Sequence, residues 1–396
     1  MTNHSERREF VAQAWRSWCR TLEESGISAL NDLASEDELD LAEGLRHLGR
    51  VSWVHLLGAV ENKDSSNPYF WRSLDPHMKM GGDNPQGLYL TAPLNGTDTF
   101  RITGSGGKVA WMSLILGRSP AARTAGLPPY GQAAFSPEMT FAADGSFELF
   151  VSPERQGPNW IGSDEFTQGL LIRQFFGSPR TATPYDLKIE NVTAGGRVPE
   201  PLTLDTVVAQ LGAAGAHYAH LLPMMLGEQQ RKSPNSFATD IGDPTSKSGG
   251  VPGGNAVTAR WQLEPHQALL VEFTPPTPCP YWDVQVGNIW YESFHYRQFF
   301  SGLTHEQAHV NGDGSVTLVL SEQDPGTANW LETAQHRQGH IAVRWQLTDG
   351  KLPIPRCTVV DASEVAERTG LPRVDDEERR SQREGLRISF NERFGI

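Results

Sequence analysis

The segment from Tyr281 to Arg297, YWDVQVGNIWYESFHYR, is dense in side chains that could transfer protons or bind a ligand. Alternation along a strand would place Tyr281, Asp283 and Gln285 on one face. A carboxylate near His and Tyr acts as a general acid or base when it is partly buried. The alternative is an edge strand with a solvated polar face and a structural ion pair at Arg297. The candidate catalytic residues are Asp283, Tyr291, His295 and Arg297.

Aromatic and amide side chains in the same half of the chain are candidate ligand contacts. The dipeptide Asn-Trp occurs at Asn159-Trp160 and again at Asn329-Trp330. Asn favours tight turns and Trp is a large apolar anchor, so a structural role comes first. The alternative is a set of tryptophan platforms for a ring-shaped ligand. The candidate substrate-binding residues are Tyr281, Trp282, Trp290, Asn329, Trp330 and His336.

The segment HEQAH, with His305, Glu306 and His309, matches the H-E-x-x-H pattern of zinc hydrolases. That chemistry needs two His one helical turn apart, a Glu that activates water, and a third ligand downstream. Here VNGDGS follows at once, so a helix could be only about one turn long, and no third ligand is obvious. A solvent-exposed turn is therefore favoured over a metal site, and no metal is expected.

Other catalytic patterns are missing from the sequence. The glycines form neither a phosphate-binding loop nor a G-x-S-x-G elbow, so neither nucleotide binding nor a serine nucleophile is indicated. The three cysteines, Cys19, Cys279 and Cys357, lie far apart, which disfavours disulfides and zinc knuckles. We expect no cofactor.

The charge of the chain limits its partners. The 396 residues include 34 Lys and Arg against 47 Asp and Glu, a formal charge of -13. This acidity disfavours both nucleic acid and an anionic membrane surface. No secretory signal and no apolar window of about 18 residues is visible. We therefore predict a cytoplasmic protein with a small-molecule substrate, and leave a homo-oligomer open.

An internal repeat gives the strongest indication of the fold. The segments DGSFELFVSPERQGPNWIGSDEFTQGLLIRQ and DGSVTLVLSEQDPGTANWLETAQHRQGHIAVRW share ordered elements at an offset between 169 and 171. Segments of alternating apolar residues bounded by Gly and Asp predict β-hairpins. The sequence therefore predicts a mainly β fold with helices (α+β): two related antiparallel β-sandwich or jelly-roll units from an internal duplication. The paired positions are Asp144 with Asp313, Ser152 with Ser321, Asn159 with Asn329, Trp160 with Trp330, Gln168 with Gln338, and Arg173 with Arg344.

Five segments are predicted along the chain. An apolar stripe from Phe10 to Leu22 predicts a first helix ended by Gly26, and a capping box at Ser35 and Glu38 opens a second. A further helix spans about 204–228. The segments are a helical start (1–75), a first sandwich (76–200), a helix with a long lid-sized loop (201–254), a second sandwich (255–361) and a charged C-terminal helix or tail (362–396).

Several segments of the sequence resemble those of the uncharacterised bacterial domain-of-unknown-function family 1214. They are GGDNPQGLYLTAPLNGTDTFRITG, SPERQGPNWIG with LLIRQFF, YWDVQVGNIWYESFHYR, and DPGTANWLETAQHRQGHIAVRW followed by LPIPRCTVV. They span roughly residues 79–360. The resemblance implies β-sandwich domains combined with helical segments and implies no particular reaction.

Three functions stay open. The first is a cofactor-independent hydrolase or lyase that acts by acid–base chemistry on a small, largely apolar or ring-containing molecule. The second is a non-catalytic β-sandwich protein that binds a carbohydrate or another small ligand. The third is a metal-dependent hydrolase that uses the HEQAH segment. A deep cavity holding titratable groups would favour the enzyme, whereas a flat aromatic shelf would favour the binding protein.

Overall fold

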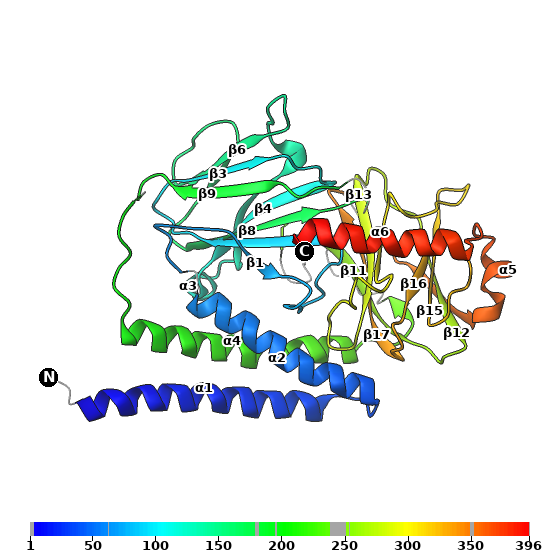
Figure 1. Ribbon diagram of the computed structural model, residues 1–396, viewed down its shortest axis with the longest axis horizontal. Coiled ribbons are helices and arrows are strands. Elements are labelled where there is room, and N and C mark those ends of the chain that lie inside the picture. Colours follow the sequence, from blue (N-terminus) through cyan, green and yellow to red (C-terminus); the bar gives the residue numbers. More distant parts are fainter. Residues whose placement is uncertain are drawn as a thin grey trace.

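The computed structural model describes residues 4–61, 63–178, 182–194, 196–237, 251–252, 254–348 and 352–395. Most of the lid-sized loop predicted within 201–254 lies outside the described residues. Figure 1 shows two β-sandwiches side by side, a layer of three long helices below them, and a C-terminal helix across the second sandwich. The predicted fold class, mainly β with accompanying helices, is confirmed.

The first sandwich pairs a five-stranded sheet, in the order β1-β2-β8-β4-β5, with a four-stranded sheet, β7-β6-β3-β9. Alternate side chains of both sheets fill the space between them, as the period of two predicts. The strands are β1 (Trp71–Leu74), β2 (Gly87–Pro93), β3 (Phe100–Ser105), β4 (Trp111–Arg118), β5 (Tyr130–Phe135), β6 (Phe147–Ser152), β7 (Trp160–Gly162), β8 (Thr167–Phe175) and β9 (Asp186–Asn191).

The second sandwich repeats this topology. Its sheets have the orders β10-β11-β17-β13-β14 and β16-β15-β12-β18, so each strand number is that of the first sandwich plus nine. The same order in both units shows that the sequence repeat is a structural duplication. The strands are β10 (Ser236–Phe237), β11 (Gly254–Gln262), β12 (Gln267–Phe273), β13 (Tyr281–Gly287), β14 (Gly302–Thr304), β15 (Val316–Ser321), β16 (Trp330–Glu332), β17 (Gln338–Gln346) and β18 (Arg356–Asp361).

The helical layer consists of α1 (His4–Asp32), α2 (Glu38–Val60) and α4 (Leu204–Gln230), which encloses Pro223. The prediction that Gly26 ends the first helix is wrong, since α1 continues to Asp32. A Cβ at Gly26 would lie 3.2 Å from Leu48 of α2, so this glycine allows close helix packing instead. The predicted capping box is also wrong, because Asp37 caps α2.

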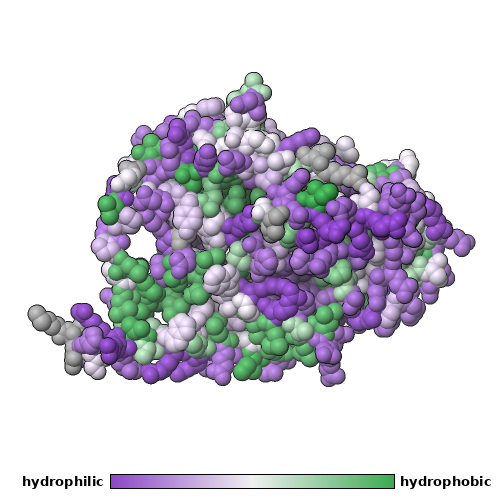
Figure 2. Space-filling view, viewed as in Figure 1, coloured by the Kyte–Doolittle hydropathy of each residue, from purple (hydrophilic) through white to green (hydrophobic). Residues whose placement is uncertain are grey.

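The C-terminal helix α6 (Asp376–Phe394) docks on its own chain. Phe390 and Phe394 pack on Tyr296 and Phe176, and the Arg393 guanidinium donates to the carbonyl of Pro85. Figure 2 shows hydrophilic side chains gathered over this helix, because its outer face is highly charged. The short helices are α3 (Pro120–Thr124) and α5 (Val365–Thr369), with 3-10 turns at Ser136–Glu138 and Ala362–Glu364. No helix among the described residues is long and apolar enough to cross a membrane.

Candidate functional site

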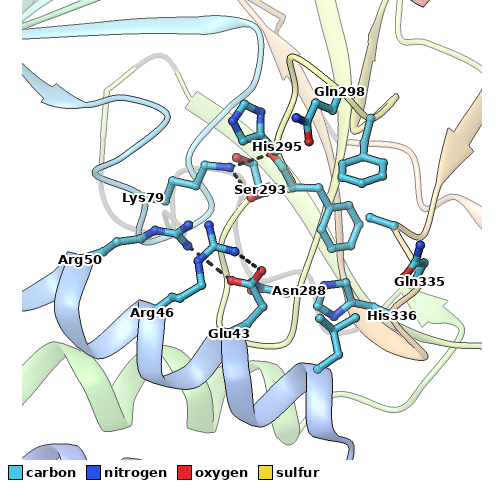
Figure 3. A pocket seen from close by; sticks show the side chains of 14 residues that line it. Glu43, Arg46, Arg50, Lys79, Asn288, Ser293, His295, Gln298, Gln335 and His336 are labelled. Atoms are coloured by element: carbon cyan, nitrogen blue, oxygen red, sulfur yellow. Dashed lines mark hydrogen bonds and ion pairs between the residues drawn. The ribbon is translucent and has the colours of Figure 1, made fainter.

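A cavity of about 310 Å³ lies where α2 meets the second sandwich, and polar and charged side chains dominate its wall (Figure 3). Four pieces of chain form the wall: α2, Lys79 ahead of β2, the loop that follows β13, and the turn that follows β16. The volume is within the range that small-molecule sites occupy. Its lining residues are Leu39, Glu43, Arg46, Arg50, Lys79, Asn288, Ser293, Phe294, His295, Gln298, Phe299, Ala334, Gln335 and His336.

Helix α2 presents Glu43, Arg46 and Arg50 on one face, because residues three and four apart in a helix are neighbours. Nη1 of Arg46 donates to Oε1 of Glu43 at 2.7 Å. Nη1 of Arg50 lies 2.6 Å from Oε2 of the buried Glu292. A guanidinium has five N–H donors, more than these contacts use, so this wall is suited to an anionic group.

The ammonium of Lys79 is buried at the cavity wall. Its Nζ donates to the backbone carbonyls of Ser293 and Phe294, both at 2.7 Å, and lies 5.1 Å from the ring centre of Tyr296. Burial lowers the pKa of Lys79 to about 8, although the charges of Asp83 and Glu292 oppose this shift. Lys79 is therefore mostly protonated at pH 7 and loses its charge as the pH rises through about 8.

A tight loop after β13 positions the next wall. Tyr291 adopts a φ of 61°, an uncommon conformation for a bulky residue and a mark of stored strain. The carbonyl of Tyr291 accepts from the N–H of Gly82 at 2.7 Å. Oδ1 of Asn288 accepts from the N–H groups of Trp290 and Glu292. These bonds hold the loop in its strained form and fix the direction of Ser293 and His295.

Beneath this loop, Glu292 is fully buried and has two partners on α2. Its carboxylate accepts from Nδ1 of His47 at 2.8 Å and from Arg50. Burial raises the pKa of Glu292, but the hydrogen bond from His47 and the charges of His47, Arg50 and Lys79 outweigh it, so its pKa is lowered. Glu292 is thus a carboxylate at neutral pH and balances the positive wall.

His336 lies on the opposite wall, directly after Ala334 and Gln335, whose φ angles are 50° and 70°. Its ring stacks on Phe294 with centres 4.9 Å apart. Nδ1 of His336 lies 3.3 Å from Oδ1 of Asp40. Burial raises the pKa of Asp40, yet hydrogen bonds from His336, Ser35 and Gln338 leave it lowered overall. This imidazole is held in place by a buried carboxylate.

His295 is the half-buried imidazole at the upper wall of the cavity (Figure 3). Its ring stacks on Phe390 of α6, with centres 5.8 Å apart. Its Nδ1 is buried and has no hydrogen-bond partner among the described residues. Burial, followed by the charge of Lys79, lowers the pKa of His295. The imidazole is therefore neutral at pH 7 and can accept a proton.

The four predicted catalytic residues do not converge in this cavity. Only His295 lines it. Asp283 is fully buried between the sandwiches, where it accepts from Asn84 at 2.8 Å. The ring of Tyr291 points away from the cavity to His340, with centres 4.7 Å apart. Arg297 lies near α6, with its guanidinium 5.8 Å from the ring centre of Phe390.

Of the predicted ligand contacts, only His336 lines the cavity. Trp282 is in the core of the second sandwich, and the OH of Tyr281 donates to the carbonyl of Phe176 at 3.4 Å. Trp290 is fully buried beneath α2. Asn329 holds a turn by donating to the carbonyls of His309 and Thr317, and Trp330 donates to Ser321. These side chains are mostly buried in packing, and the tryptophans among them present no exposed shelf.

The HEQAH segment forms a turn directly after β14 and no helix. The N–H of Ala308 bonds to the carbonyl of Thr304, and the ring of His305 packs on Tyr281 with centres 5.2 Å apart. Within the described ranges, no group of three or more His, Cys, Asp or Glu side chains is arranged to hold a metal ion.

Comparison with known proteins places the chain in a family. Residues 262–349 match the family described as Protein of unknown function (DUF1214). An uncharacterised protein from Burkholderia cenocepacia is 32% identical, with a TM-score of 0.82 over 89% of this chain and 98% of that chain. The chain belongs to the DUF1214 family. A Vibrio parahaemolyticus protein is 10% identical over 79% of this chain and 99% of that chain, with a TM-score of 0.47. No curated protein matches the sequence.

Most of the charged residues that line the cavity of this DUF1214 chain were not predicted from the sequence as site residues. Arg46 and Arg50 lie on α2, whose amphipathic pattern is ordinary. The sequence around them therefore does not distinguish them from charged side chains that face solvent. In the sequence, Lys79 stands with Asp83 and Asn84 in a Gly-rich segment, HMKMGGDNPQG, which holds a charge of each sign and matches no phosphate-binding pattern. One signal was available: Glu292 lies within the same polar segment as His295 and follows a tryptophan and tyrosine that must be buried.

Proposed function

We propose that the protein is a cofactor-independent hydrolase or lyase, and that the cavity between α2 and the loop after β13 is its active site. The observation that supports this most is a cavity of small-molecule size with titratable side chains on several walls. The substrate would be a small molecule with one anionic group and an apolar or ring-containing part.

The proposed binding mode follows from the chemistry of the walls. Arg46 and Arg50 bind the anionic group, since their guanidinium donors exceed the acceptors around them. The apolar part packs on Phe294, Phe299 and Leu39, which line the same cavity. The buried Glu292, together with Glu43 on the wall itself, offsets the repulsion between the two guanidinium groups and Lys79.

The proposed chemistry divides between two side chains. His295 acts as the general base, because it lines the cavity and its lowered pKa keeps the imidazole neutral. Lys79 stabilises negative charge that develops on the substrate, because it is mostly protonated at pH 7 and its position is fixed by two carbonyls. His336, oriented by Asp40, is the candidate proton donor on the opposite wall.

We also propose where in the cell this activity takes place. We place it in the cytoplasm, which the three free cysteines support, because secreted proteins commonly pair them.

The test is a panel of small carboxylic acids, their esters and lactones, and β-substituted acids, screened first for binding by thermal shift and then for turnover. We expect turnover of at least one binder, and a loss of about 100-fold or more in His295→Asn. The matched control is His77→Asn, whose side chain is 78% exposed and lies outside the cavity. Binding without any turnover would contradict the enzyme and support a ligand-binding protein.

A further inference from the structure

A second polar region lies between the two sandwiches, outside the cavity. Arg173 on β8 and Arg344 on β17 occupy equivalent positions of the duplicated sheets and face this region. Strand register gives each arginine one neighbour on the next strand: Ser113 pairs with Arg173, and Asp283 pairs with Arg344. At this position the two copies differ by a hydroxyl in place of a carboxylate, and on the other side Arg173 has Tyr89 of β2 where Arg344 has Ala256 of β11.

In the second copy the carboxylate neutralises the arginine. Nη1 of Arg344 lies 3.5 Å from Oδ1 of Asp283, and Nη2 donates to the carbonyl of Gly82 at 2.8 Å. Asp283 is fully buried, and Asn84 donates to its second oxygen. The cation and the anion therefore share one desolvated site, as a buried charge requires.

In the first copy the arginine has no such partner. Arg173 is only 7% exposed. Its Nε donates to Oγ of Ser113 at 2.9 Å and its Nη2 to the carbonyl of Pro252 at 2.8 Å. No carboxylate forms an ion pair with Arg173 among the described residues. Burial, followed by the smaller effect of the Arg344 charge, lowers the pKa of Arg173 to about 10, although Tyr89 and Tyr130 oppose this shift. A buried guanidinium without an anion is costly and uncommon.

The surroundings of Arg173 supply donors and aromatic rings but no counter-charge. Its guanidinium lies 5.6 Å from the ring centre of Trp111 and 5.5 Å from that of Phe175. Nε1 of Trp111 is buried with no acceptor among the described residues. Tyr89, the cross-strand neighbour of Arg173 on β2, is partly buried, whereas Ser113 is fully buried. An acceptor-rich, negatively charged group is the chemical complement of this arrangement.

We propose that a small carboxylate anion binds here, at the place beside Arg173 that Asp283 holds beside Arg344. The carboxylate would accept from the Arg173 guanidinium and from the hydroxyl of Ser113. This site is separate from the cavity of the proposed function, since none of these residues lines that cavity. The duplication therefore produced one internally neutralised arginine and one that takes its anion from solution.

The decisive variant is Ser113→Asp, which gives the first copy the carboxylate of the second. Isothermal titration calorimetry on the full chain would use acetate and benzoate as probes, with sulfate as a competing oxyanion. We expect saturable carboxylate binding to wild type and a loss of at least about tenfold in affinity in Ser113→Asp. The variant without ligand should also melt at a higher temperature than wild type, because its own carboxylate then pairs with Arg173.

Two controls make the result specific. Ser105→Asp adds the same charge at the exposed end of β3 and should bind the probes like wild type. Arg173→Met keeps an apolar stem and removes the cation, and it should also lose binding. The proposal is overturned if wild type binds no carboxylate, if Ser113→Asp and Arg173→Met bind as well as Ser105→Asp, or if sulfate binds more tightly than acetate. Loss of all binding in Lys79→Met but none in Ser113→Asp would assign the anion to the cavity and likewise overturn it.

Discussion

Nδ1 of His47 lies 2.8 Å from Oε1 of Glu292, and this contact joins the helical layer to the second sandwich across 245 residues of sequence. Both side chains are almost completely removed from water. Arg50, one helical turn further along α2, binds the other oxygen of the same carboxylate. The wall of the cavity and the packing of α2 therefore depend on one buried anion.

Glu292→Gln should destabilise the protein by about 3 kcal/mol, because it leaves the Arg50 guanidinium without its counter-charge and the buried imidazole of His47 without its carboxylate partner. Urea unfolding at pH 7 measures this loss. The matched control is Glu9→Gln, which breaks an ion pair to Arg16 whose side chains are 62% and 56% exposed. That change should cost no more than about 0.5 kcal/mol. Equal losses in the two variants would contradict the role given to Glu292.

Stability should fall as the pH drops from about 6.5 toward 4, because of His55. Burial, followed by the charge of His217, lowers the pKa of His55 from 6.5 to about 4. The unfolded chain then binds a proton in this range that the folded chain does not, so acid favours unfolding. His55 accounts for a loss on the order of 3 kcal/mol. Urea unfolding at several pH values should show a smaller slope in His55→Asn, and an unchanged slope would refute the assignment.

Turnover by the proposed active site should decline above pH 8, where Lys79 loses its proton. Lys79→Met should lower kcat/KM and abolish this alkaline decline. Lys79→Arg retains a charge to a higher pH, so the decline should move upward while some activity remains. A pH profile of kcat/KM for any substrate found in the panel tests this. The same alkaline decline in Lys79→Met as in wild type would exclude Lys79 as its source.

Gly44→Ala should destabilise the protein by about 2 kcal/mol or more through overpacking. A Cβ at Gly44 would lie 2.5 Å from the ring of Trp290, which is fully buried and donates from Nε1 to the carbonyl of Asp40. The control is Gly49→Ala on the same helix, where a Cβ meets no atom within 4 Å. That change should stabilise by about 0.5–1 kcal/mol through helix propensity. Thermal melts of both variants give the comparison.

The duplicated sandwich was predictable because its signals are local and repeated. Alternation along β13 predicted that Trp282 and Asp283 lie on opposite faces, and in the structure Trp282 is in the core of the sandwich while Asp283 lies on the other face. The repeat pairing of Arg173 with Arg344 also agrees with the strand register. The sequence also weakly aligns KVAWMSLILG with CPYWDVQVGN at an offset of 171, through Trp111 and Trp282, but the strand register does not equate these two tryptophans. Trp282 faces the core of its sandwich, whereas Trp111 packs between the two sandwiches, so the strands are offset by one residue less.

The sequence by itself determined the mainly β class, the duplication and the long helices, since these follow from periodicity and repetition along the chain. Tertiary structure alone decided which charged side chains share a site. Nζ of Lys79 meets the carbonyl of Ser293 across 214 residues, and Nδ1 of His336 meets Asp40 across 296. Such contacts depend on how α2 packs against two distant loops, and no local pattern encodes that packing. The physical reason is that charge pairing is set by distance in space, whereas hydrophobic period is set by position along the chain.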